Sequence, residues 1–570
     1  MRTATASPVT VHGRDESVDA IDAQTLPSAD DLIAPPPRSI APSLVNGATL
    51  NRAAPKGAAQ HLAHLPAETS IPPAPDRRYI TAALLLVMVL ASMEQTITST
   101  AMPTIIGDLH GLEHYSWVAS IYLLACTVSM PLYGRLADAL GRKPVILWAI
   151  GLFLVASGLA GAAHSMTQLI IFRGLQGLGA GGIMPVVLTI LGDIFTLKER
   201  ARIQGVFSAV WGSASLAGPW LGAHLVLHFG WRSVFYINFP LALLGLIVLV
   251  RKYRDHEKPH STDLDLPGAI ALAIGCMGVL ALVSRLGPDG WSWPAIVALT
   301  AISGTAIVYF IRHELRAANP IMPPDLMTHR LVAPALMGSL LLGVGFLSLD
   351  TFVPLYVQGG RGGDASAAAN VVTPVMLTWA LSGIFAAPLV VRWGFRRTAL
   401  LGSSIVVAGF VGLIVCAYTG SSRHILTAIL AVTGLGFGPA SMSYLLAAQG
   451  AVQWQRRGVV TSSVQFYRTI GGAVGIGVLG AMFNAMIAPD LARLSRQGAT
   501  PAALLDPHLR GTLPPELLAS VEHALCRGLL LVFIAMLVFA VLQVVFTLMM
   551  SEAKCDHAVS KAEALEAMAG

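Results

Sequence analysis

The sequence predicts an all-α integral membrane protein with two six-helix pseudo-symmetric bundles and two inserted linker helices, about fourteen transmembrane helices in all. Composition is the first reason: of 570 residues, 54% are hydrophobic and only 12% are charged, whereas soluble globular chains carry about 25% charged residues. Apolar runs of about 20 residues, long enough to cross the hydrocarbon layer, recur along the chain. Short motifs repeat at matching positions in the two halves.

Clusters of Gly, Pro and charged residues separate the apolar runs and set the predicted spans. The predicted spans centre near Val89, Ala125, Leu154, Gly179, Ser213, Leu243, Gly275, Ile302, Val344, Leu381, Val407, Gly436, Ala473 and Ala535.

The Lys and Arg residues of the short loops predict the orientation, because cytoplasmic loops carry an excess of them. With the N-terminus inside, the inward loops hold 18 such residues and the outward loops hold four, Arg232, Arg285, Arg361 and Arg423. We therefore expect a multi-pass protein of the cell (inner) membrane with both termini in the cytoplasm. The formal net charge of +6 reflects this topology and does not indicate nucleic-acid binding.

An internal repeat predicts the domain organisation. "GLGAG" at 177–181 matches "GLGFG" at 434–438, and the loop "YGRLADALGRKP" after the second span has a counterpart in "VVRWGFRR" after the tenth. Two six-helix halves around a midplane site are an architecture of secondary transporters. The predicted domains are a disordered cytoplasmic tail (1–77), an N-terminal bundle (78–251), a linker with two helices (252–329), a C-terminal bundle (330–551) with an outward loop (486–525), and a cytoplasmic tail (552–570).

Nothing in the sequence indicates an enzyme. The first 77 residues are rich in Pro, Ala and Ser and lack sustained periodicity, which is typical of disorder; a misassigned start codon is the alternative for part of this tail. The five cysteines are scattered and predict neither a disulfide framework nor a metal site. The outward loop carries no catalytic constellation, and no soluble enzyme domain fits between the spans.

Two charges inside the predicted spans of the first half need an explanation. Glu94 follows the apolar run that begins near Tyr79, and Arg173 lies between "QLIIF" and "GLQGLGAGG". A charge at the centre of a membrane helix costs roughly 2.5 to 3.5 kcal/mol on insertion scales. We expect both side chains to face a central, water-filled cavity, where each stabilises the other. A purely structural buried hydrogen bond is the alternative for Glu94.

The motifs over residues 78–550 resemble those of the major facilitator superfamily, in its fourteen-span branch of multidrug drug:proton antiporters. The loop after the second span carries Gly134, Arg135, Leu136, Ala137, Asp138, Gly141, Arg142 and Lys143. The fourth span carries Leu169, Arg173, Gln176, Gly177, Gly179 and Ala180. The fifth span carries Gly205, Gly218, Pro219 and Gly222, with Ala214 and Ala223 where glycine is usual. The first span has Glu94 where this branch usually has Asp.

The resemblance implies roles for these residues. Glu94 and Arg173 are the candidates for proton coupling. Gly134, Asp138, Gly141 and Arg142 are candidates for a cytoplasmic gate, and Asp193 is the acid that we expect Arg142 to pair with; a positive-inside topology signal is the alternative. Gly205, Gly218, Pro219 and Gly222 are candidates for an antiporter seal, with ordinary small-residue packing as the alternative. The residues themselves add Asp350, Arg468 and Gln176 as cavity candidates; a solvated position near the outer end of its span is the alternative for Asp350. Met and aromatic residues could form an apolar lining, with ordinary packing as the alternative: Met93, Tyr122, Met184, Trp211, Trp379 and Phe466.

The expected function is proton-coupled secondary active export of lipophilic or amphiphilic compounds by alternating access. An exporter of an endogenous lipid, siderophore or metabolite is the alternative within the same fold, and a transport-inactive membrane sensor is the alternative outside it. The expected partners are a small lipophilic substrate, protons and the lipid bilayer; no cofactor is expected besides the proton gradient. Similar exporters of double-membrane bacteria work with a periplasmic adaptor and an outer-membrane channel, and the sequence leaves that partnership open.

Overall fold

The computed structural model describes residues 74–109, 115–255, 265–284, 292–363, 365–495 and 514–552, and every regular element within these ranges is helical. The first half contains α2 (Ala74–Leu109), α3 (Tyr115–Leu140), α4 (Arg142–Gly161), α5 (Met166–Ile194), α6 (Leu197–Phe229), α7 (Ser233–Tyr236) and α8 (Asn238–Lys252). The linker contains α9 (Leu266–Ser284), α10 (Trp293–Glu314) and α11 (Pro324–Thr328). The second half contains α12 (Val332–Leu355), η2 (Tyr356–Gly360), α13 (Ala365–Trp393), α14 (Phe395–Thr419), α15 (Arg423–Gly450), η3 (Trp454–Arg456), α16 (Arg457–Ser495) and α19 (Pro515–Leu548).

Each of the fourteen predicted span centres falls within a helix, so the all-helical fold class is confirmed. In the described residues, twelve helices are long and apolar enough to cross a membrane. The other two candidates are α6, which is long but rich in small and polar residues, and α9, whose apolar part covers only Leu266–Leu282. Both stay predictions as membrane spans. The predicted tails lie outside the described residues, apart from 74–77 and 552.

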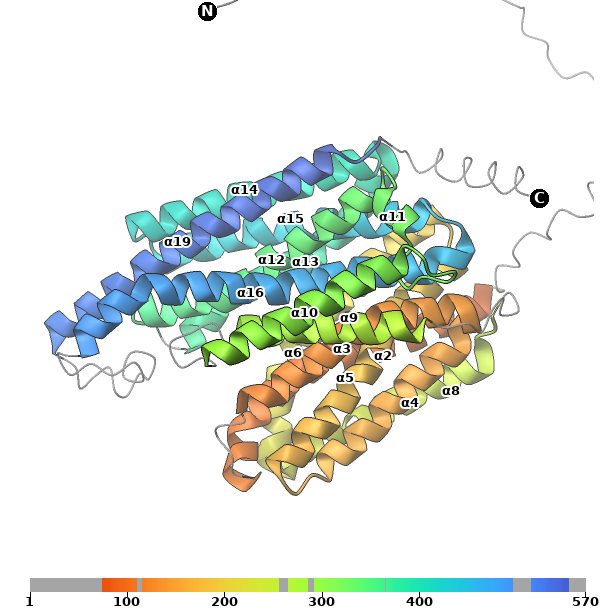
Figure 1. Cartoon of the computed structure of the whole chain (residues 1–570), viewed down its shortest axis with the longest axis horizontal. Coiled ribbons are helices and arrows are strands. Elements are labelled where there is room, and N and C mark those ends of the chain that lie inside the picture. The colour runs from red at the N-terminus through yellow and green to blue at the C-terminus, as the bar shows by residue number, and fades with distance from the viewer. Residues whose placement is uncertain are drawn as a thin grey trace, which may run out of the picture. The chain divides into compact units, whose positions relative to one another are not determined.

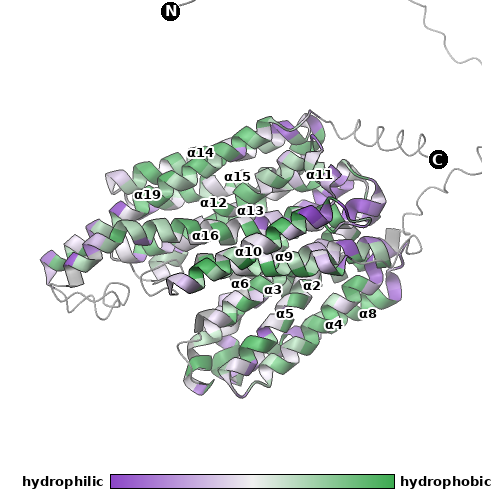
Figure 2. Cartoon of the chain, in the orientation of Figure 1, coloured by the Kyte–Doolittle hydropathy of each residue, from purple (hydrophilic) through white to green (hydrophobic). Residues whose placement is uncertain are grey.

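Hydrophilic residues gather near α11, at the end of the bundle where α3 joins α4, α5 joins α6 and α15 joins α16 (Figure 2). We call this end the basic end, because Arg142, Lys143, Arg456 and Arg457 lie at these junctions. The opposite end, where α2 leads to α3 and α16 leads to α19, is called the distal end. The long helical shafts between the two ends are apolar, as a bilayer requires.

The internal repeat has a structural counterpart at the basic end. A single residue separates α3 from α4 and α13 from α14, namely Gly141 with φ of 96° and Gly394 with φ of 82°. Only glycine adopts such positive φ values without strain. The matching glycines in "GRK" and "WGFRR" therefore allow the same abrupt reversal between the second and third helices of each half.

The repeated glycine motifs also pack in the same way. A Cβ on Gly177 would lie 2.3 Å from the Tyr122 carbonyl oxygen of α3, and one on Gly179 would lie 2.6 Å from the Phe153 nitrogen of α4. Their counterparts Gly434 and Gly436 face α13 and α14 equally closely, with contacts of 2.4 Å and 2.5 Å to carbonyl oxygens. Small residues thus let the fourth helix of each half press against the second and third helices.

Helices α2–α8 group on one side of the linker helices and α12–α19 group on the other (Figure 1). Helix α9 packs against α3 of the first half and α16 of the second, and the halves meet directly through α3 with α16 and α6 with α13. The predicted outward loop 486–525 is too long, because α16 continues to Ser495 and α19 begins at Pro515. Residues 496–513 lie outside the described part of the chain.

Candidate functional site

Glu94 lies on α2 and is buried inside the first half, with 1% of its surface exposed. Its Oε1 accepts a 2.6 Å hydrogen bond from Arg173 Nη1 on α5, so the two predicted intramembrane charges form an ion pair. Thr98 Oγ1, one turn further along α2, donates to the same oxygen over 3.1 Å. A buried charge pair is stable only when its remaining polar atoms are also satisfied, so the surroundings of the pair matter.

The other partners close a ring of hydrogen bonds, which we call the Glu94 ring: Glu94, Arg173, Gln176, Ser157 and Asn238. Arg173 Nη1 also donates to Gln176 Oε1 over 2.7 Å, and Gln176 Nε2 donates to Ser157 Oγ over 2.6 Å. Asn238 Nδ2 then donates to both Ser157 Oγ (2.9 Å) and Glu94 Oε2 (2.7 Å). Helices α2, α4, α5 and α8 are thereby linked through one buried polar network.

Tyr122 of α3 covers the guanidinium of Arg173, whose central carbon lies 4.2 Å from the ring centroid. Arg173 Nε also donates to the Val118 carbonyl oxygen over 3.4 Å. The cation is therefore held by a carboxylate, an amide oxygen, a backbone carbonyl and an aromatic face. These contacts bring α3 into the same cluster.

The expected exposure of Glu94 and Arg173 to the central cavity is wrong for this conformation. Both residues are 1% exposed, and neither lines the cavity described below, whereas Tyr122 does. The physical reason is the rotation of the helices: α2 and α5 turn these side chains toward α4 and α8, where Ser157 and Asn238 satisfy them. Tyr122 touches the cavity and Arg173 alike, so it connects the two regions.

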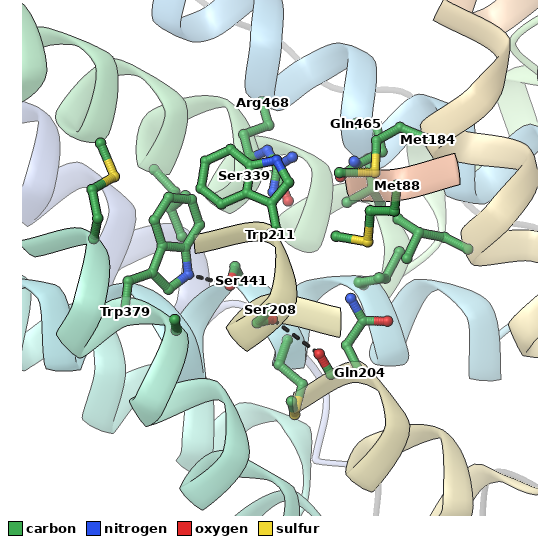
Figure 3. A pocket seen from close by; sticks show the side chains of 17 residues that line it. Met88, Met184, Gln204, Ser208, Trp211, Ser339, Trp379, Ser441, Gln465 and Arg468 are labelled. Carbon is green, nitrogen blue, oxygen red and sulfur yellow. Dashed lines mark hydrogen bonds between the residues drawn. The ribbon is translucent and has the colours of Figure 1, made fainter. Parts of the chain in front are cut away.

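The central cavity lies between the halves and has a volume of about 220 Å³. Trp211 of α6 and Trp379 of α13 both line it and contact each other in its wall, with ring centroids 5.4 Å apart. Of the predicted apolar lining, Tyr122, Met184, Trp211 and Trp379 contribute, while Met93 and Phe466 do not line this cavity. A smaller cavity of about 60 Å³, toward the basic end, continues from it and shares Trp211, Trp379, Gln465 and Arg468 (Figure 3).

The three predicted cavity residues divide between two places. Asp350 of α12 and Arg468 of α16 line the central cavity. Gln176 does not, because it is fully buried between Arg173 and Ser157 in the Glu94 ring. The sequence placed Gln176 on the correct helix but not on the correct face.

At the basic end, Arg142 joins the halves. Its Nε donates to Asp193 Oδ2 over 2.9 Å, which is the pairing that the sequence predicts, and its Nη2 lies 3.0 Å from Asp138 Oδ1. Nη2 also donates to the Trp454 carbonyl oxygen over 2.8 Å, while the guanidinium carbon stacks 3.8 Å from the Trp454 ring centroid. Trp454 belongs to η3 of the second half, so Arg142 bridges the two bundles.

Asp138 makes a second bridge at this end. Its two oxygens accept from the backbone nitrogens of Gly458 (2.9 Å) and Val459 (2.8 Å), in the first turn of α16. A carboxylate at a helix N-terminus is favoured by the unpaired N–H groups and the helix dipole. Gly134 permits the close approach, because a Cβ there would lie 2.7 Å from the Gly458 carbonyl oxygen. We call Asp138, Arg142, Asp193, Trp454, Gly458 and Val459 the basic-end cluster.

Gly141 holds the basic-end cluster in position. Its positive φ makes the sharp turn into α4, and a Cβ on it would lie 2.5 Å from Asp255 Oδ2. Asp255 in turn accepts from the Lys143 backbone nitrogen over 3.0 Å. Burial raises the pKa of the Asp255 carboxyl above its ordinary range, and the hydrogen bond from Lys143 acts in the opposite direction.

Helix α6 carries the four predicted seal residues, and three of them make close helix contacts. A Cβ on Gly205 would lie 2.7 Å from Ile384 Cα on α13, in the other half. Gly218 and Gly222 instead face α2, where a Cβ would lie 2.0 Å from Thr96 Oγ1 and 2.3 Å from Thr100 Oγ1. Pro219 is exposed within a continuous helix. Helix α6 therefore contacts α13 near the basic end and α2 nearer the distal end.

Sequence reasoning missed Ser157, Asn238 and Trp454. Asn238 stands out as an amide in the apolar run "FYINFPLALLG", so a search for polar residues in every span could have found it. Ser157 gives no such signal, because isolated serines are common in membrane helices. Trp454 acts partly through its backbone carbonyl, and a backbone contact leaves no mark in the sequence.

Comparison with known proteins agrees with this architecture. Residues 84–476 match the Major Facilitator Superfamily, and the chain belongs to that family of membrane transporters. It is 34% identical over 510 residues to the multidrug transporter protein MdtP of Bacillus subtilis (strain 168), covering 84% of this chain and 94% of that protein. It is 29% identical over 493 residues to multidrug resistance protein 3 of the same organism, covering 84% of this chain and 96% of that protein.

The fold is also similar to a solved transporter structure. The proton:xylose symporter XylE, bound to 6-bromo-6-deoxy-D-glucose, superposes with a TM-score of 0.54 at 14% sequence identity, covering 84% of this chain and 96% of that one. At this identity the similarity concerns the fold alone.

Proposed function

We propose that this protein is a proton-coupled antiporter that exports lipophilic or amphiphilic compounds by alternating access. The observation that carries the proposal is the Glu94 ring: a carboxylate that can take up a proton is paired with a permanent cation, one side chain away from a cavity between the halves. The names of the multidrug relatives support a drug-like substrate class.

The conformation supports one step of such a cycle. In the described residues, the hydrogen bonds between the halves lie at the level of the cavity or between it and the basic end, as with Arg142 to Trp454 and Asp138 to Val459. The excess of Lys and Arg at the basic end favours an orientation in which this end faces the cytoplasm and the protein lies in the cell membrane. The conformation is then closed to the cytoplasm, as expected after substrate has been carried outward.

A proton arriving at Glu94 changes the energy of this conformation. Protonation removes the negative charge opposite Arg173, so the guanidinium loses its carboxylate partner and must find another. Since Arg173 contacts Tyr122 and Glu94 shares α2 with Thr96 and Thr100, the change reaches the cavity wall and α6 together. Helix α6 contacts α13, which provides a route to the opposite half. Differential stabilisation of two conformations is what coupling requires.

The experiment is a compound screen in a susceptible bacterial host that expresses the chain or an empty vector. We expect higher tolerance to several amphiphilic compounds and lower accumulation of a fluorescent one, with both effects lost when an ionophore collapses the proton gradient. Unchanged tolerance and accumulation for lipophilic compounds, together with export of a single endogenous metabolite, would favour the alternative substrate class.

A further inference from the structure

The central cavity is lined by one acidic and one basic side chain, and these two do not pair with each other. Asp350 and Arg468 both line it, yet neither side chain has a hydrogen-bond or ion-pair partner among the described residues. Gln465 lines the same cavity, is 3% exposed, and its side-chain amide is likewise without a partner in the described part of the chain. Asp350 is exposed and Arg468 is half-buried, so the cost of a missing partner falls mainly on Arg468 and the buried amide of Gln465, and a ligand acid would supply that partner.

Arg468 and Asp350 lie at different depths along the axes of α16 and α12. Helices α12 and α16 both run from the basic end toward the distal end. They meet closely where Gly343 faces Arg468, since a Cβ on Gly343 would lie 1.9 Å from the Arg468 carbonyl oxygen. Asp350 lies seven residues beyond Gly343, which is about 10 Å further along the helix axis. Arg468 is therefore the deeper charge, and Asp350 lies toward the distal end.

An aromatic wall lines the cavity together with Arg468. Trp211 and Trp379 come from different halves and face the cavity close to Arg468 (Figure 3). Phe346 stacks edge-on against Trp379, with ring centroids 4.4 Å apart. Flat aromatic rings bury a large apolar area and fit offset or edge-on contacts with such side chains.

We propose that the cavity recognises amphiphilic aromatic zwitterions, with the acidic group bound by Arg468 and Gln465 and the basic group bound by Asp350. A guanidinium and an amide donor together suit a carboxylate, and a carboxylate nearer the distal end suits an ammonium. The proposal narrows the substrate class of the proposed exporter and rests on that function.

The test measures equilibrium binding to purified protein with three matched probes. The probes are ciprofloxacin, which is an aromatic zwitterion, its methyl ester, which lacks the acid, and its N-acetyl derivative, which lacks the basic amine. Arg468→Gln should weaken binding of the zwitterion and the N-acetyl probe about tenfold or more, because a charge-assisted contact is lost, and should spare the ester. Asp350→Asn should weaken the zwitterion and the ester and spare the N-acetyl probe.

Controls keep a folding defect apart from lost recognition. Arg468→Lys retains the charge and should recover part of the affinity, and Arg397→Gln makes the same chemical change at an exposed position far from the cavity. Equal loss of affinity for all three probes in Arg468→Gln would overturn the proposal. Wild-type protein that binds the ester as tightly as the zwitterion, or that binds none of the probes, would overturn it too. Because binding is measured without a proton gradient, a failure here leaves proton-driven export standing, and a failure of export leaves the binding pattern standing.

Discussion

The Glu94 ring explains how a membrane helix tolerates a carboxylate. In an apolar interior, every unsatisfied polar atom costs about 1 to 3 kcal/mol, and charged groups cost more. Glu94 accepts from Arg173, Thr98 and Asn238, so both its oxygens have donors. The same contacts depend on the present arrangement of α2, α5 and α8. A change in that arrangement would break them together, which is the property that the proposed coupling site needs.

Asn238 offers a residue-level test of this view. Asn238→Ala removes the donor to Glu94 Oε2 and opens the Glu94 ring, so the rate of transport and its pH profile should both change. Substrate binding should change little, because Asn238 does not line the cavity. Transport in vesicles across a pH series checks this, with the exposed Asn370→Ala as control. A profile that coincides with that of the parent protein would remove Asn238 from the coupling network.

Part of the site was readable from single residues. Glu94 and Arg173 are conspicuous because charges are rare in apolar runs, and Asp193 is recognisable as the acid for Arg142 because it ends the fourth span. The partners Ser157 and Trp454 were not readable, since helix rotation decides which uncharged groups meet. Rotation also explains why Glu94, Arg173 and Gln176 turn away from the cavity that the sequence assigned to them.

At the scale of single elements, α6 carries one of the contacts between the halves, against α13. Gly205→Ala should push α6 and α13 apart, because the added methyl would meet backbone and not a flexible side chain. Overpacking of this kind costs about 1 to 3 kcal/mol, so we expect a lower melting temperature and slower transport. Gly151→Ala, where a Cβ meets nothing within 4 Å, is the matched control. Equal melting temperatures and equal transport rates in the two variants would show that the close contact of Gly205 with α13 affects neither stability nor transport.

The junction of α3 with α16 gives a second element-level prediction. Asp138→Asn removes the negative charge opposite Arg142. It also weakens the two hydrogen bonds that residue 138 accepts from backbone nitrogens of α16. Gly141→Val strains the turn and collides with Asp255. Each variant should insert, fold and bind substrate, yet transport about tenfold more slowly, because charge-assisted contacts are worth roughly 1.5 to 3 kcal/mol. Normal transport kinetics in both variants would show that the loop between α3 and α4 acts only as a positive-inside topology signal and not as a gate.

The elements themselves followed well from the sequence. Long apolar runs, Gly141 and the repeated glycine motifs were sufficient to predict the helices and the two related halves. The limits of the helices were less accessible: α16 and α19 extend beyond the apolar segments into residues whose helical pattern is weak, which shortened the expected outward loop. Helix length past the membrane depends on local propensity and packing, not on hydropathy.

For the whole molecule, alternating access requires the two halves to separate near the basic end. Ser208 on α6 and Gly383 on α13 belong to different halves, and a Cβ on Gly383 would lie 3.1 Å from the Ser208 Cβ. A small shift brings the two Cβ atoms to the separation found in disulfides, which is about 3.5 to 4.5 Å with a mean of about 3.8 Å. Ser208→Cys with Gly383→Cys, in a chain without its native cysteines, should form a disulfide that stops transport and preserves substrate binding. Reductant should restore transport; continued transport by the cross-linked protein would contradict a separation of the halves here.

The measurement that bears most directly on the central claim is substrate-induced proton movement in proteoliposomes with an imposed pH gradient. Glu94→Gln keeps the size of the side chain but cannot carry the charge, so proton-driven export should fail while substrate binding persists. Glu94→Asp should retain part of the activity, and Arg173→Ala combined with Glu94→Gln should cost less than the sum of the single changes, because both act on one network. Undiminished proton-coupled export by Glu94→Gln would contradict the account and leave the Glu94 ring a structural feature.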